Sequence, residues 1–174
     1  MRTTRTQQEF IKRYEPVHAD FERFCRARVY GEMESGDLIN ETLLVAFQKQ
    51  SELKNEKAFL SFLIGIAIRI LSNAHRKRHT VKMEEHHEAS AMANGPATDS
   101  KAAIAQLHKA LASLPAEQKE CLILFELSGF SIKEICKMQG AKESAVKQRL
   151  RRGRLSLREL LTDSVAEEEQ AYNG

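Results

Sequence analysis

SIKEICKMQGAKESAVKQRLRRGR, residues 131–154, decides the fold that this sequence predicts. Ser131 and Glu134 have the spacing of a capping box, in which the two side chains accept hydrogen bonds from free backbone N–H groups at a helix start. Gly140 tolerates the left-handed conformation that allows a sharp turn. The stretch therefore predicts a short helix, a tight turn and a second helix over about residues 143–161.

The second helix has one apolar side and one polar side. Its apolar side is expected to face a core, with a glycine that admits a close neighbour: Val146, Leu150, Gly153 and Leu157. The opposite side turns four polar residues outward: Ser144, Lys147, Gln148 and Arg151. Seven basic residues occur between positions 142 and 158, against the single acidic residue Glu143: Lys142, Lys147, Arg149, Arg151, Arg152, Arg154 and Arg158.

A short helix, a glycine turn and a basic helix form the helix-turn-helix arrangement, whose second helix fits the major groove of DNA. Lys147 and Arg151 have the chemistry to bond guanine, and Gln148 that to bond adenine. The alternative is a charged face that only meets water, as most charged faces do.

The rest of the chain predicts an all-α protein of two small helical domains joined by a flexible linker. Apolar side chains recur at helical spacing from Phe10 to Phe24, from Ile39 to Phe47 and from Phe59 to Ala74. The periodicity stops over about residues 79–101, around Gly95-Pro96, and resumes at Ile104. The acidic residues after Ser164 are expected to form a mobile tail.

Composition limits the function. The chain has 174 residues, 42% of them hydrophobic and 29% charged, with a formal net charge of +3. Such a small total charge means that any binding to an acidic partner depends on where the basic residues cluster. The three widely spaced cysteines argue against disulfides and zinc–thiolate sites, and no apolar run predicts a signal peptide or membrane insertion. We therefore expect a cytoplasmic protein without a cofactor or metal.

Two segments carry a family resemblance. LPAEQKECLILFELSGFSIKEICKMQGAKESAVKQRLRRGRLSLREL resembles region 4 of the sigma-70 family, and GDLINETLLVAF with KAFLSFLIGIAIRILSNAHRKR resembles region 2. The order and the linker between them are typical of the extracytoplasmic-function (ECF) sigma factors of bacteria. The resemblance implies a region 2-like domain at 8–80, a linker at 81–102, a region 4-like domain at 103–162 and an acidic tail at 163–174.

The resemblance implies that the chain binds core RNA polymerase, recognises promoter DNA and opens it. The region 4 helix would contact the minus-35 element through Lys142, Ser144, Lys147, Gln148, Arg149, Arg151, Arg152 and Arg154. Ser144, Lys147, Gln148 and Arg151 are the base-reading candidates, and the other four are backbone contacts. Lys142 stands where the family commonly has a serine-like cap, so this helix start is expected to be looser.

The resemblance also implies a polymerase-binding surface on the helix that follows Gly36. Its expected residues combine carboxylates with an exposed apolar edge: Asp37, Leu38, Asn40, Glu41, Thr42 and Val45. Such a mixed surface suits a basic helical partner.

The minus-10 element would be opened by the next loop and helix. The expected residues are Lys54, Asn55, Arg69, Ser72, Asn73, Arg76, Lys77 and Arg78. In this region Phe62 replaces the family's usual tryptophan, and Ile64, Gly65 and Ile68 occupy positions that the resemblance turns outward. That apolar outer face predicts a weak or unusual minus-10 preference.

Other functions are alternatives to that of a sigma factor. A two-domain helix-turn-helix regulator that binds an operator alone is the main alternative, but such proteins usually dimerise and this sequence offers no obvious dimer helix. A metal site formed by His75, His79, His86 and His87, with Glu84, Glu85 and Glu88 nearby, lacks an accompanying ligand motif. A nuclease that uses His75 or His79 is the formal enzyme alternative. No phosphate loop or activated nucleophile predicts an enzyme. The family resemblance also implies an inhibitory anti-sigma partner.

Overall fold

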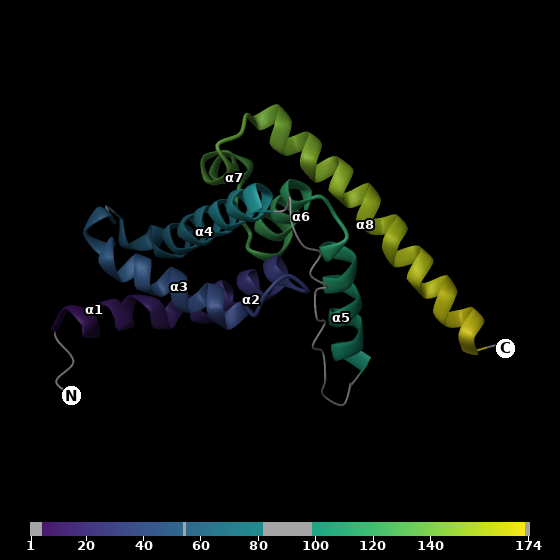
Figure 1. The fold of residues 1–174 in the computed structure, drawn as a ribbon, viewed down its shortest axis with the longest axis horizontal. Helices are drawn as coiled ribbons and strands as arrows, with labels where there is room; N and C mark the ends of the chain where they lie inside the picture. Colours follow the sequence, from purple (N-terminus) through teal and green to yellow (C-terminus); the bar gives the residue numbers. More distant parts are fainter. Residues whose placement is uncertain (1–4, 54, 82–98, 173–174) are drawn as a thin grey trace. The chain divides into compact units, whose positions relative to one another are not determined.

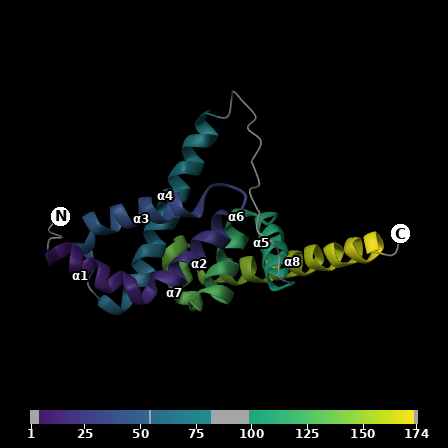
Figure 2. The ribbon, with the colours of Figure 1, turned by 90° about the horizontal axis from the view of Figure 1, so that it is seen from below.

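The computed structural model describes residues 5–53, 55–81 and 99–172, and no strand occurs among them. Figures 1 and 2 show an assembly of helices only. The helices in the first half of the chain are α1 (Arg5–Tyr14), η1 (Glu15–Val17), α2 (His18–Val29), α3 (Ser35–Gln48), η2 (Gln50–Glu52), η3 (Glu56–Ala58) and α4 (Phe59–Val81). Those in the second half are α5 (Asp99–Ala112), α6 (Ala116–Leu122), η4 (Ile123–Leu127), α7 (Ile132–Gln139) and α8 (Glu143–Tyr172).

The chain divides into two compact units. The first comprises Met1–Arg26 and Glu32–Ala89, and the second comprises Ala27–Gly31 and Ser90–Gly174. The all-α fold predicted from the sequence is confirmed. None of the described helices combines the length and the apolar composition that crossing a membrane requires.

The first unit has an aromatic core. Phe21, Phe24 and Phe59 are almost completely buried, and Phe10 packs edge-on against Phe47 and Phe59 at centroid distances of 5.4 and 5.6 Å. Edge-to-face packing is the favoured geometry of aromatic pairs. The turn η1, which contains Pro16, separates α1 from α2. In the same unit α3 packs against α4.

The second unit is built on α8. Helices α5, α6 and α7 all pack against it (Figure 1). Of the apolar side predicted for α8, Val146, Leu150 and Gly153 are buried as expected, and Leu157 is half-buried. A Cβ atom added at Gly153 would lie 3.0 Å from Leu122 Cδ1, so the glycine permits the close crossing of α6 and α8.

Two predicted boundaries differ from the structure. Helix α5 begins at Asp99, so residues 99–102, which the sequence assigns to the linker, are helical. Helix α8 continues to Tyr172, about ten residues beyond its expected end. The residues after Ser164 are mostly Ala, Glu and Gln, which favour helix, and no Gly or Pro interrupts them before Gly174. The remaining linker positions, 82–98, lie outside the described residues.

Candidate nucleic-acid and polymerase interfaces

The helix-turn-helix begins with the predicted capping box. Ser131 Oγ accepts a hydrogen bond from the backbone N–H of Glu134 at 3.4 Å, and Glu134 Oε2 accepts one from the Ser131 N–H at 2.8 Å. These hydrogen bonds hold the pKa of Glu134 below its ordinary value. Gly140 ends α7 with a φ of 61°, which is the predicted left-handed turn. Local sequence alone therefore sets both ends of the short helix.

Helix α8 presents a basic side to solvent. Seven of the eight residues expected at the minus-35 element are exposed: Lys142, Ser144, Lys147, Gln148, Arg151, Arg152 and Arg154. Arg158 and Leu155 extend the same side, with Leu155 52% exposed. The residues expected at the minus-35 element did not include these two, although both lie at helical spacing from Arg151.

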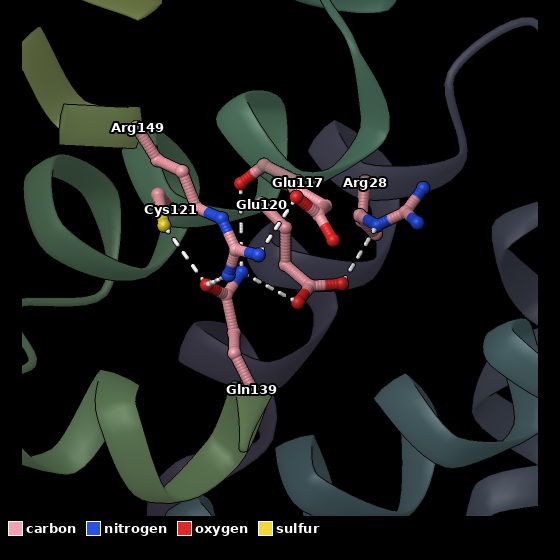
Figure 3. Close-up of polar contacts among 6 residues, drawn as sticks. All are labelled: Arg28, Glu117, Glu120, Cys121, Gln139 and Arg149. Carbon is pink, nitrogen blue, oxygen red and sulfur yellow. Dashed lines mark hydrogen bonds and ion pairs between the residues drawn. The ribbon is translucent and has the colours of Figure 1, made fainter. Parts of the chain in front are cut away.

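Arg149 differs from the other basic residues of α8, because its side chain is only 21% exposed. Its guanidinium donates a hydrogen bond to Gln139 Oε1 at 2.9 Å and pairs with Glu117 Oε2 at 2.7 Å (Figure 3). Arg149 lies four residues before the buried Gly153, and residues four apart are neighbours on one side of a helix. Arg149 therefore lies at the edge of the side of α8 that faces the core. Arg149 is therefore not turned outward like the other seven residues expected at the minus-35 element.

Two other basic residues of α8 have carboxylate partners on the surface. Lys147 Nζ lies 2.6 Å from Glu143 Oε1, and this contact raises the pKa of Lys147. Arg154 pairs with Glu126 at 2.8 Å and lies 5.3 Å from the centre of the Phe125 ring. Both contacts are exposed, where an ion pair contributes little and a phosphate can compete for the cation.

The exposed side of α4 is polar. Four expected minus-10 residues, Arg69, Ser72, Asn73 and Arg76, are exposed together along it. Asn73 Oδ1 accepts a hydrogen bond from Arg76 at 2.9 Å. Asn55 is exposed as well, and its Oδ1 accepts the N–H of Lys57 at 3.0 Å. Lys54 and the side chains of Lys77 and Arg78 lie outside the described part of the chain.

The predicted apolar outer face of α4 was wrong. Ile64 is 0% exposed and Ile68 6% exposed, so neither is available to DNA. The apolar residues of α4 cover more than half of its circumference, and a helix of this kind is buried on more than one side. The expectation of a weak minus-10 preference loses its basis.

Helix α3 combines exposed carboxylates with one exposed leucine. Asp37, Asn40 and Glu41 are exposed as expected, and Val45 is half-buried. Leu44, which the sequence reasoning missed, is 60% exposed on the same side. Leu44 follows Glu41 by three residues and Asp37 by seven, and this spacing could have indicated from the sequence that the three residues share one side of the helix.

Two residues expected on that surface belong to the core. Leu38 and Thr42 are both 0% exposed, so their assignment to polymerase binding was wrong. The apolar residues from Ile39 to Phe47 predicted a buried side of α3 that is rotated about the helix axis from the side that is actually buried. The side that packs against α4 instead runs through Leu38, Thr42 and Ala46.

Comparisons with known proteins agree with this geometry. A family model described as "Sigma-70, region 4" matches residues 104–157. The ECF RNA polymerase sigma factor SigF of Caulobacter vibrioides is 31% identical over 126 residues, which cover 71% of this chain and 68% of that protein. The chain belongs to the ECF RNA polymerase sigma factors. This membership favours a sigma factor over a stand-alone helix-turn-helix regulator, and the family is regulatory, not catalytic.

Further relatives of this sigma factor support the assignment. The ECF RNA polymerase sigma factor EcfG of Rhodopseudomonas palustris is 29% identical, covering 76% of this chain and 74% of that protein. The sigma factor RpoE of Bartonella quintana, solved in complex with the anti-sigma factor NepR, superposes with a TM-score of 0.74 at 25% identity, covering 89% of this chain and 98% of that one. CnrH, solved with the cytosolic domain of CnrY, shares the fold with a TM-score of 0.65, at 18% identity and 90% coverage of both chains.

Proposed function

We propose that this sigma factor binds core RNA polymerase, directs it to promoters through minus-35 and minus-10 elements, and promotes transcription initiation. The observation that carries the proposal is the exposed basic side of α8, presented by a capped helix-turn-helix. A helix with that surface suits the major groove, where cations contact phosphates and polar side chains read bases. In this proposal residues 8–80 form the region 2-like domain and residues 103–162 the region 4-like domain.

The minus-35 contacts divide by position on α8. Ser144, Lys147, Gln148 and Arg151 lie along the most exposed side and are the proposed base-reading residues. Lys142, Arg152 and Arg154 flank them and are the proposed phosphate contacts. Lys147 has to leave Glu143 to reach DNA, which an exposed ion pair permits at little cost.

The minus-10 contacts belong to the polar side of α4. Arg69, Ser72, Asn73 and Arg76 are the proposed residues, with Asn55 in the preceding loop and Lys54, Lys77 and Arg78 outside the described side chains. Gly65 lies one helical turn before Arg69, and no heavy atom lies within 4 Å of an added Cβ. Extruded bases are held by contacts of this kind, which offset the cost of unpairing.

The polymerase contact belongs to α3. Asp37, Asn40 and Glu41 are exposed on the same side of α3 as Leu44, and this group replaces the surface predicted with Leu38 and Thr42. An exposed leucine on the same helix side as two carboxylates provides an apolar anchor and a charge that attracts a basic partner.

A solved relative suggests how the chain is regulated. RpoE of Bartonella quintana was solved in complex with the anti-sigma factor NepR. We propose that this chain is likewise held by an anti-sigma factor and acts in the cytoplasm, where the polymerase is.

Run-off transcription with purified core polymerase on a genomic promoter library tests the proposal. We expect transcripts that require this chain. Arg151→Ala should abolish promoter selection while binding to core polymerase persists, and Leu44→Glu should abolish core binding. Operator binding by the isolated chain, with no effect on polymerase, would contradict the proposal and favour a stand-alone regulator.

A further inference from the structure

Arg149 belongs to a polar cluster that spans both sides of the helix-turn-helix turn. The cluster comprises Glu117, Glu120 and Cys121 on α6, Gln139 at the end of α7 and Arg149 on α8 (Figure 3). All five residues lie in the second unit. The contacts join the last residue of the short helix to the second turn of the DNA-facing helix.

Gln139 is the centre of the cluster. Its Oε1 accepts hydrogen bonds from Arg149 at 2.9 Å and from the Cys121 thiol at 3.0 Å. Its Nε2 donates to Glu120 Oε1 at 2.8 Å, and Glu120 is 8% exposed. A rotated amide would bring N–H groups against the guanidinium, so the donors and acceptors fix one orientation.

Glu120 is itself anchored. Its Oε2 accepts a hydrogen bond from Arg28 Nε at 3.3 Å, and both side chains are about nine-tenths buried. Removing one member of a buried set leaves its partners without hydrogen bonds, which destabilises more than the contact itself contributes. The carboxylate side of the cluster is therefore fixed before DNA arrives.

Arg149 makes contacts that a phosphate contact would have to break. One terminal nitrogen of its guanidinium donates to the amide oxygen of Gln139, and the other pairs with the carboxylate of Glu117. The planar guanidinium group suits two simultaneous contacts of this kind. Arg152, three residues further along α8, is exposed, and no hydrogen bond or ion pair joins its side chain to another described residue. The same residue type thus occurs on one helix in two opposite environments.

We propose that Arg149 is a positioning residue for promoter recognition: it fixes the angle of α8 through Glu117 and Gln139 and makes no phosphate contact. The effect on DNA rests on the proposed function, whereas the contacts within the unit do not. Losing Arg149 should therefore weaken promoter binding by misplacing Ser144, Gln148 and Arg151.

Salt dependence of promoter binding separates positioning from phosphate contact. The full chain with core polymerase is titrated with a promoter fragment at several salt concentrations, using Arg149→Gln and the matched control Arg152→Gln. The slope of log Kobs against log salt is negative, and each lost phosphate contact reduces its magnitude by about 0.9. We expect Arg152→Gln to reduce the magnitude of the slope, and Arg149→Gln to weaken binding at every salt concentration with the slope unchanged.

Two further variants probe the geometry. Arg149→Lys keeps the charge but loses the two-pronged contact, so a positioning role predicts weak binding and a phosphate contact predicts nearly full binding. Arg149→Glu combined with Glu117→Arg restores the ion pair with its charges exchanged. We expect this pair to bind promoter better than Arg149→Glu alone; a phosphate contact predicts no recovery, because a carboxylate would face the DNA.

Thermal unfolding tests the cluster without DNA. The melting temperatures of Arg149→Gln, Glu117→Gln and the double variant should be non-additive, since both single changes remove the same contact. Three outcomes would each overturn the proposal. They are additive changes in melting temperature, a salt slope of smaller magnitude for Arg149→Gln, and promoter binding by the Arg149→Glu/Glu117→Arg variant that is no better than that of Arg149→Glu. If the unaltered chain gives no promoter complex with core polymerase, the proposed function fails while the unfolding cycle still decides whether the contact exists.

Discussion

At the scale of single residues, Ser131 determines where the helix-turn-helix starts. Its hydroxyl accepts the N–H of Glu134, and the Glu134 carboxylate accepts the backbone N–H of Ser131. We expect Ser131→Ala to lower the free energy of unfolding by about 1 kcal/mol, as measured by urea denaturation. Ser72→Ala, on the exposed side of α4, is the control and should change stability by less than about 0.5 kcal/mol.

The capping carboxylate also gives stability a pH dependence. Hydrogen bonds from Ser131 lower the pKa of Glu134, so the folded state favours the ionised form. Its contribution is present above the unfolded pKa of about 4.5 and is lost as the pH falls through the lower folded value. The stability difference between the unaltered chain and Glu134→Gln should therefore shrink below pH 4.5; a constant difference down to pH 3 would contradict this.

The thiols differ in accessibility. Burial raises the pKa of Cys25 to about 12 and that of Cys121 to about 11, whereas Cys136 is half-buried. At pH 8 a thiol reagent should modify Cys136 in the folded protein and all three cysteines after unfolding. Cys136→Ser should remove the fast reaction. Because the folded state holds these protons more tightly, the stability contribution of the two buried thiols should be full below pH 9 and be lost between about pH 9 and pH 12.

At the scale of elements, the crossing of α6 and α8 depends on Gly153. Leu122 Cδ1 would lie 3.0 Å from an added Cβ, and the larger branches of a valine would have to displace the leucine further. We expect Gly153→Val to destabilise the protein by about 1–3 kcal/mol. Gly65→Ala is the matched control in α4, where an added Cβ meets no heavy atom within 4 Å, and should stabilise by about 0.5–1 kcal/mol. Equal effects of the two changes would contradict the close crossing.

The two sides of α3 should respond differently to mutation. Leu38 is 0% exposed and Leu44 60% exposed, six residues apart on one helix. Leu38→Ala should lower the free energy of unfolding by about 2–5 kcal/mol. Leu44→Ala should leave stability within about 0.5 kcal/mol and weaken binding to core polymerase, measured by co-purification or fluorescence anisotropy. Full polymerase binding by Leu44→Ala would remove Leu44 from the proposed interface.

At the scale of the whole molecule, two compact units carry the proposed contacts to two promoter elements. Linking two binding modules in one chain raises apparent affinity by roughly 10²–10⁴-fold over that of either alone. A protease site inserted at about residue 90 should leave transcription intact, and cleavage at that site should reduce it by at least tenfold. Undiminished transcription after complete cleavage would show that the connection contributes nothing.

Patterns that act over one or two helical turns were predictable. The capping box at Ser131, the turn at Gly140 and the buried side of α8 through Val146 and Leu150 all follow from neighbours three or four residues away. The family motifs added the expected polymerase and promoter contacts, and the comparisons agree with that family. The same spacing of three or four residues also predicted which side of α8 is basic and exposed.

The sequence by itself determined the helical fold, the helix-turn-helix and the family, because local hydrogen bonding and helical periodicity are written in nearby residues. Only the tertiary structure decided that Arg149 turns toward Glu117 and Gln139, and that Leu38, Thr42, Ile64 and Ile68 are buried. Partners ten to thirty-two residues away set the environment of Arg149, and no local pattern encodes them. Burial likewise depends on which neighbouring helix covers each side, a choice that the periodicity of one helix leaves open.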